Sequence, residues 1–114
     1  MNDGFERQLK KGVLDMLVLQ LLSEGARYGY QLIQELKKQS GDIFSLKDGT
    51  LYPILYRLED SGYVVSKWSA EEGRQMPRKY YEITQDGIDA LKNMRVSWSN
   101  INNGIAQVLK GEVK

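Results

Sequence analysis

Six apolar residues near the end of the chain recur in steps of three and four. This spacing is that of a heptad seam along one face of an α-helix. With Thr84 as its N-cap and an end near Lys110, the helix would be roughly 39 Å long at 1.5 Å per residue. The rest of the chain cannot cover that length, so the seam predicts a two-fold homodimer. The seam residues are Leu91, Met94, Trp98, Ile101, Ile105 and Val108.

A helix predicted over 7–23 supports the same conclusion, because it carries apolar residues on two faces. One stripe contains Leu14, Leu17, Val18 and Leu21, and the other, outer stripe contains Leu9, Gly12, Met16 and Leu19. A helix that is apolar on two faces packs on two sides. We expect the first stripe to face the core of the domain. The second stripe supplies Leu9 and Met16 to the dimer interface, beside the seam.

The stretch 47–58 has the pattern of a helix that contacts DNA. Its buried stripe falls at Leu51 and at the positions three, four and seven residues later. The opposite face carries hydroxyl groups and a guanidinium, which meet phosphates and base edges in a major groove. Asp48 or Thr50 would cap the helix, which places Pro53 at or near the end of the first turn. An ordinary core helix with a solvated polar face would give the same pattern.

The neighbouring segments complete a winged helix-turn-helix. A helix predicted over 28–39 precedes the 47–58 helix, and a longer connector than usual joins the two. Alternating residues predict strands over 63–68 and 79–84, with a hairpin tip between them. From Arg74 to Tyr81 the hairpin carries three basic residues and no acidic one. This charge pattern fits a wing that contacts DNA phosphates, and it also fits a solvated loop. The fold class predicted is mainly α (α+β), with a DNA-binding domain over 1–83 and a dimerisation helix over 84–114.

Composition excludes several classes of protein. The chain has 114 residues, enough for one domain, and a net charge of +1, so any contact with nucleic acid must come from a local basic patch. It contains no Cys and no His, which argues against a disulfide, a zinc site or an imidazole base. We therefore expect no catalytic residue, metal or cofactor. No signal peptide or membrane span is evident, which predicts a cytoplasmic protein.

Four stretches resemble the PadR family of bacterial transcriptional regulators. They are LLSEGARYGYQL at 21–32, GTLYPILYRLE at 49–59, RKYYEIT at 78–84, and Gly87. The resemblance covers nearly the whole chain, and the single C-terminal helix is similar to the shorter branch of the family. It implies a homodimeric repressor that binds a palindromic promoter operator on double-stranded DNA and is released by a small molecule.

The resemblance also implies which residues contact DNA. In the family the third helix enters the major groove and the wing lies along the backbone or the minor groove. Thr50 and Tyr52 are expected to contact bases, and the others phosphates. The expected DNA-binding residues are Tyr28, Lys47, Thr50, Tyr52, Arg57, Arg74, Arg78 and Lys79.

Trp98 is the residue on which an effector site is predicted. A branch of the family that binds flat aromatic drugs has a tryptophan in a matching Ser-Trp-Ser context. Two symmetry-related rings could hold a planar aromatic effector, with Met16 and Met94 as walls and Asn102 as a polar partner. Trp98 filling the dimer core is the alternative. For the whole protein, the alternative is a winged-helix module that binds another protein and no DNA.

Overall fold

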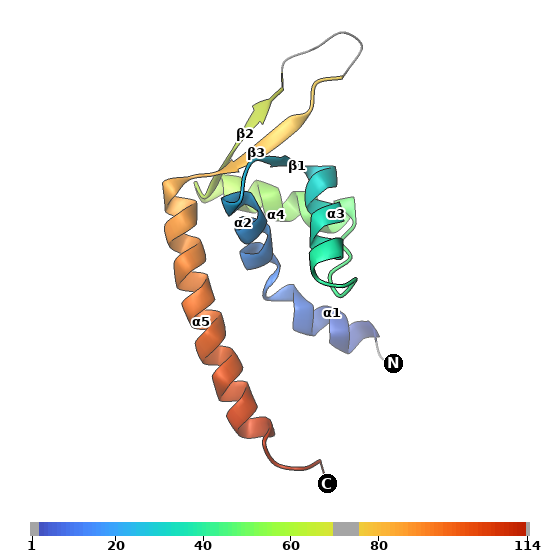
Figure 1. Cartoon of the computed structure of the whole chain (residues 1–114), viewed down its shortest axis with the longest axis vertical. Helices are drawn as coiled ribbons and strands as arrows, with labels where there is room; N and C mark the ends of the chain where they lie inside the picture. Colours follow the sequence, from blue (N-terminus) through green and yellow to red (C-terminus); the bar gives the residue numbers. More distant parts are fainter. Residues whose placement is uncertain (1–2, 70–75, 114) are drawn as a thin grey trace.

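The computed structural model describes residues 3–69 and 76–113 and shows a winged helix-turn-helix followed by one long helix (Figure 1). The mainly helical fold with a small antiparallel sheet agrees with the class predicted from the sequence. The elements are α1 (Asp3–Lys11), α2 (Leu14–Ser23), β1 (Arg27–Tyr28), α3 (Gly29–Gln39), α4 (Asp48–Asp60), β2 (Val64–Trp68), β3 (Lys79–Ile83) and α5 (Gln85–Leu109).

The helix predicted over 7–23 is two helices. α1 ends at Lys11, α2 begins at Leu14, and α1 departs from the line of α2 (Figure 1). Gly12 lies at the break, where its lack of a side chain makes a continuous helix less favourable by about 1 kcal/mol relative to alanine. Leu19, which the sequence pattern assigned to the outer stripe, is fully buried, whereas Leu9 is 81% exposed. The break therefore divides the outer stripe: Leu19 on α2 joins the core, and Leu9 on α1 stays at the surface.

The sheet contains a strand that the sequence analysis missed. β1 pairs antiparallel with β3, which places Tyr28 opposite Tyr80, and β2 pairs with the other edge of β3. The helix predicted from residue 28 therefore begins one residue later, at Gly29. β2 and β3 lie within one residue of the strands predicted for the wing. β1 fixes the start of α3 against the base of that wing.

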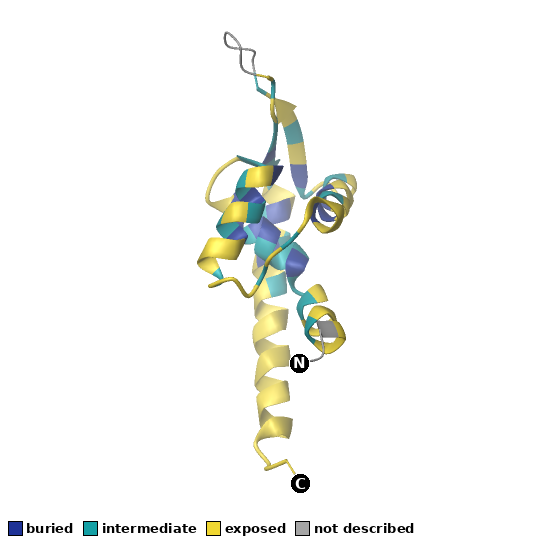
Figure 2. Cartoon of the chain, turned by 90° about the vertical axis from the view of Figure 1, so that its right-hand side faces the viewer, coloured by how far each residue is buried: buried dark blue, intermediate teal, exposed yellow. Residues whose placement is uncertain are grey.

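The core lies between α2, α3, α4 and the sheet (Figure 2). The stripe predicted for α4 is buried as expected, and Val64 and Tyr81 close the core from the sheet. Leu91 is 5% exposed, so the first turns of α5 belong to the same core. The buried residues are Leu14, Val18, Leu19, Leu21, Leu22, Leu32, Leu36, Leu51, Ile54, Leu55, Leu58, Val64, Tyr81 and Leu91.

The start of α4 differs from the prediction in its cap. Lys47 is the N-cap residue, and neither Asp48 nor Thr50 caps the helix with its side chain. The backbone of Lys47 is extended, and its carbonyl accepts hydrogen bonds from the N–H groups of Thr50 and Leu51, both at 3.0 Å. The side chains of Asp48 and Thr50 therefore make no capping hydrogen bond. Pro53 lies within the second turn of the helix.

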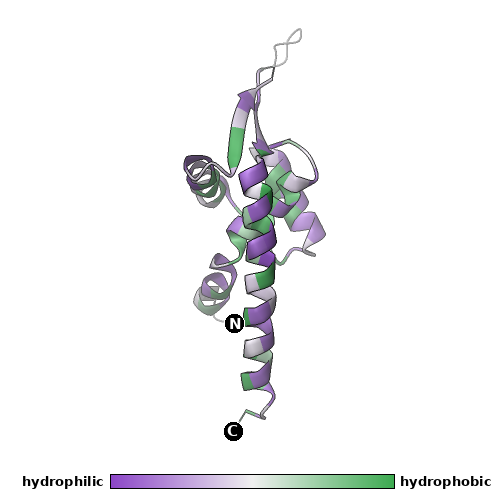
Figure 3. Cartoon of the chain, turned by 90° about the vertical axis from the view of Figure 1, so that its left-hand side faces the viewer, coloured by the Kyte–Doolittle hydropathy of each residue, from purple (hydrophilic) through white to green (hydrophobic). Residues whose placement is uncertain are grey.

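α5 begins as predicted and then leaves the domain. The hydroxyl of Thr84 accepts a hydrogen bond from the N–H of Gly87 at 3.0 Å, and the helix runs for 25 residues without a break at Gly104. Beyond Met94 every described residue is exposed (Figure 2). Apolar residues nevertheless recur along this half of the helix (Figure 3). Among the described residues, no helix has the length and apolar character needed to cross a membrane.

Candidate nucleic-acid interface

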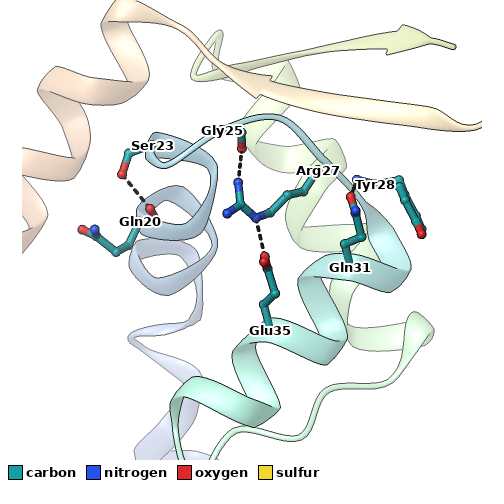
Figure 4. A network of polar contacts seen from close by, with 7 residues as sticks. All are labelled: Gln20, Ser23, Gly25, Arg27, Tyr28, Gln31 and Glu35. Atoms are coloured by element: carbon teal, nitrogen blue, oxygen red, sulfur yellow. Dashed lines mark hydrogen bonds and ion pairs between the residues drawn. The ribbon is translucent and has the colours of Figure 1, made fainter.

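A polar network holds the segment between α2 and α3 (Figure 4). The guanidinium of Arg27 donates to the carboxylate of Glu35 and, at 2.6 Å, to the carbonyl of Gly25. The backbone N–H of Tyr28 donates to the side-chain oxygen of Gln31 at 3.1 Å. The Arg27 side chain is only 16% exposed, so its charge is partly desolvated and compensated by Glu35. These contacts fix the position of Tyr28.

A cleft of about 670 Å³ lies between the start of α3, the outer face of α4 and the wing. We call it the reading cleft. Among the described residues, its lining includes two cations, Arg78 and Lys79, and no carboxylate. Positive side chains among aromatic rings suit contact with the sugar-phosphate backbone and with base edges. The aromatic residues that line the cleft are Tyr28, Tyr30, Tyr52, Tyr56, Trp68 and Tyr81.

Arg78 is held against Tyr28. Its guanidinium donates a hydrogen bond of 2.7 Å to the Tyr28 hydroxyl, and its central carbon lies 4.5 Å from the centre of the Tyr28 ring. Tyr80 meets the same ring edge to face, with 5.4 Å between the ring centres. A planar guanidinium on a tyrosine ring keeps further N–H groups for an external acceptor. The pair places a preorganised cation at the junction of the wing and α3.

Lys79 points to the opposite side of the reading cleft. Its ammonium nitrogen lies 5.9 Å from the centre of the Tyr56 ring and 5.6 Å from that of Tyr81. Both distances are within the range of a cation–π contact. Tyr56 is 52% exposed on α4. Lys79 thus joins the wing to the outer face of α4.

Tyr81 forms the floor of the reading cleft. The residue is 1% exposed, and its hydroxyl makes no hydrogen bond to any residue within 3–69 or 76–113. Burial raises the pKa of the Tyr81 hydroxyl to about 12, and the nearby Tyr56 and Glu59 act in the same direction. The hydroxyl is therefore neutral at physiological pH and adds no negative charge beneath the two cations.

Tyr52 occupies the space that Gly29 leaves open. A β-carbon at position 29 would lie 2.8 Å from the ring carbon that bears the Tyr52 hydroxyl. Tyr52 is half-buried, whereas Thr50 is exposed at the start of α4. The absence of a side chain at position 29 therefore sets where the Tyr52 ring lies.

The remaining predicted DNA-binding residues lie elsewhere. Arg57 donates to the carboxylate of Asp15 at 2.6 Å and does not line the reading cleft. Lys47 and Thr50 line a separate cleft beside α1. Arg74 lies outside the described residues. The reading cleft thus brings together Tyr28, Tyr52, Arg78 and Lys79.

The sequence analysis did not select four aromatic residues of the reading cleft, namely Tyr30, Tyr56, Trp68 and Tyr81. Alternation along β2 places Trp68 on the same face as Val64 and Ser66, which predicts a buried position. Val64 is buried, whereas Trp68 is 68% exposed. The sequence pattern therefore gave no signal that Trp68 is a surface residue of the wing.

A third cleft, of about 730 Å³, lies between α1, α2 and the middle of α5, and we call it the helical pocket. Met16 and Trp98, two of the residues expected at an effector site, both line it. Met94 is half-buried and packs against the core, and neither Met94 nor the exposed Asn102 lines the pocket within one chain. The guanidinium of Arg95 closes one wall by donating to the side-chain oxygen of Gln20 at 3.0 Å.

The fold and the reading cleft define a winged helix-turn-helix protein of the DNA-binding type. The family described as transcriptional regulator PadR-like matches residues 18–93. The chain belongs to this family, whose members are transcriptional regulators and not enzymes. It is therefore a PadR-family transcriptional regulator, which implies regulation through DNA binding.

Three relatives illustrate the similarity. A PadR family transcriptional regulator from Eggerthella lenta is 33% identical with a TM-score of 0.84, and the match covers 96% of this chain and 93% of that one. A transcriptional regulator from Clostridium thermocellum is 30% identical with a TM-score of 0.83, over 90% and 99% of the two chains. The negative transcriptional regulator PadR of Bacillus subtilis is 28% identical over 88% of this chain, which spans 52% of that relative's length.

Proposed function

We propose that the protein is a homodimeric repressor that binds a palindromic promoter operator and is released by a planar aromatic effector. The observation that carries the proposal is the reading cleft, where two cations and a set of tyrosines line the outer face of α4. The B. subtilis relative is named a negative transcriptional regulator, which supports repression as the direction of control.

The proposed dimer rests on the outer half of α5. Ile101 and Val108 of the seam are 60% and 81% exposed, and Leu9 of α1 is 81% exposed. A contiguous apolar surface of this kind marks an interaction site. We assign residues 84–114 to dimerisation and 1–83 to DNA binding, with α1 contributing to the dimer. Leu91, which was also expected at the interface, is instead buried in the core of its own chain. The proposed interface comprises Leu9, Met16, Met94, Trp98, Ile101, Ile105 and Val108.

The proposed DNA contacts follow from the position of α4. Its N-terminal end, with Thr50, would enter the major groove, while Arg78 and Lys79 would hold the backbone beside the wing. Two copies would place their α4 helices about one DNA turn apart, roughly 34 Å. Arg57 and Arg74 remain predicted contacts. Arg57 would have to leave Asp15 in order to reach a phosphate.

The direct test is a gel-shift titration against DNA from the promoter of the protein's own transcription unit. We expect retardation that survives a scrambled competitor at physiological salt, with an affinity in the nanomolar range (about 10⁻⁸ M). If scrambled competitor DNA abolishes the retardation as readily as operator DNA does, the result would contradict operator recognition. Absence of any retardation would favour the protein-interaction module instead.

The contribution of the wing is tested by the variant Arg78→Gln/Lys79→Gln. If each residue neutralises one phosphate in each copy, the dimer loses four contacts, and the slope of log Kobs against log salt should become shallower by about 3.6. The matched control is Lys92→Gln/Lys110→Gln, which removes two exposed charges from α5 and should keep the wild-type slope. Equal slopes for the wing variant and the wild type would remove both residues from the interface.

The effector site is tested with a chain that has one tryptophan. The sequence contains two, so Trp68→Phe leaves Trp98 as the single indole fluorophore. Titration with tricyclic aromatic compounds should quench its emission saturably and release operator DNA over the same concentration range. Emission that stays constant while DNA remains bound would instead support Trp98 as part of the dimer core.

A further inference from the structure

A second cation-rich cleft lies at the start of α4 and shares no lining residue with the reading cleft. It has a volume of about 650 Å³ and is enclosed by α1, the end of the connector between α3 and α4, and the first turn of α4. We call it the α1 cleft. Four cations line it, namely Arg7, Lys10, Lys11 and Lys47, against the single carboxylate of Glu6.

The positive charge of this cleft is largely uncompensated. Glu6 pairs with the ammonium nitrogen of Lys10 at 3.1 Å. Arg7, Lys11 and Lys47 are exposed and form no ion pair with any residue that the structure describes. The whole chain has a net charge of only +1, so three unpaired cations around one cleft are a marked local concentration. A surface of this kind attracts a polyanion.

The α1 cleft is continuous with the start of α4. Lys47 is the N-cap residue of that helix, Thr50 lies in its first turn, and both line the cleft. The N–H groups of its first turn add to the positive potential, which the carboxylate of Asp48 in the same turn partly offsets. In the structure α1 lies at the end of the domain opposite the wing (Figure 1). The two clefts therefore lie on either side of the outer face of α4.

We propose that the α1 cleft binds the DNA backbone on the side of α4 away from the wing. α1 then becomes a third DNA-contacting element, with Arg7 and Lys11 neutralising phosphates beyond those held by the wing. The inference rests on the proposed function, because it takes operator DNA as the polyanion. With α1, each copy would contact a longer stretch of DNA at its half-site than the helix-turn-helix and the wing alone would contact.

The test is the full-length variant Arg7→Gln/Lys11→Gln in operator binding. Loss of two phosphate contacts in each copy of the dimer should make the slope of log Kobs against log salt shallower by about 3.6 and leave the preference for operator over scrambled DNA unchanged. Ethylation interference should lose the phosphates on the wing-distal side of each half-site. The control Lys92→Gln/Lys110→Gln should keep both the slope and the interference pattern.

Each other outcome overturns the inference in a recognisable way. A wild-type slope and pattern in the double variant would remove α1 from the DNA contact. A lower sedimentation mass for the variant than for the wild type would assign Arg7 and Lys11 to the contact between copies. Wild-type protein that binds no DNA would refute the proposed function together with this inference, whereas failure of the variant prediction alone leaves the proposed function in place.

Discussion

A chain with Ile101→Asp and Ile105→Asp is expected to sediment as a monomer and to lose operator affinity by a factor on the order of 10² to 10⁴. The two side chains are 60% and 49% exposed in the single chain, so the substitutions remove no intrachain core contact. In a dimer each carboxylate would face an apolar seam, where an unpaired charge is strongly unfavourable. One monomer could then occupy only one half-site at a time. Analytical ultracentrifugation and gel-shift titration measure the two effects.

The matched control places the same two charges on outward positions of the same helix. Asn100→Asp/Asn103→Asp lies off the seam, and both residues are exposed. This variant should keep the wild-type mass and affinity, and circular dichroism should give equal helix content for all three proteins. A seam variant with the wild-type mass would show that the seam does not join the copies.

Gly87→Ala is expected to lower the free energy of unfolding by about 3 kcal/mol, which is at the upper end of the cost of overpacking. A β-carbon at this position would lie 3.0 Å from the carbonyl carbon of Tyr63, closer still to its oxygen, and 2.7 Å from a side-chain carbon of Ile83. The Tyr63 carbonyl accepts the N–H of Thr84 at 3.0 Å, so it cannot move without loosening the start of α5. Urea titration followed by circular dichroism measures the change.

Gly49→Ala is the control for this substitution. Gly49 also lies within a helix, but a β-carbon there would have no atom within 4 Å among the described residues. Alanine at position 49 should leave stability unchanged or raise it by up to about 1 kcal/mol. Equal stability of Gly87→Ala and the wild type would mean that the junction between the wing and α5 adjusts without cost.

The sequence was most informative where its pattern is periodic. The buried stripe of α4 and the seam of α5 repeat over several turns, so single exceptions do not hide them. The Thr84 cap and the two wing strands were predicted for similar local reasons, and the structure has them within one residue. In these places the chemistry of near neighbours in the chain decides the local structure.

The features that were missed depend on residues far apart in the chain. β1 has two residues and exists because the edge of β3 pairs with it. Arg57 pairs with Asp15, which lies 42 positions away, so its side chain is engaged in a way that the 47–58 pattern could not reveal. The reading cleft likewise combines α3, α4 and both wing strands, and its aromatic lining becomes evident only when these elements are placed together.

The order of the sheet, β1-β3-β2, has a consequence for solubility. An exposed strand edge is a template for aggregation between molecules. One edge here is a strand of only two residues, and the other is β2, which carries Lys67. The Lys67 side chain is 67% exposed, and its ammonium nitrogen lies 3.1 Å from the carboxylate of Glu82. A short edge and a charged edge both oppose the addition of a foreign strand. The wing can thus stay extended in free protein at high concentration without starting fibrous assembly.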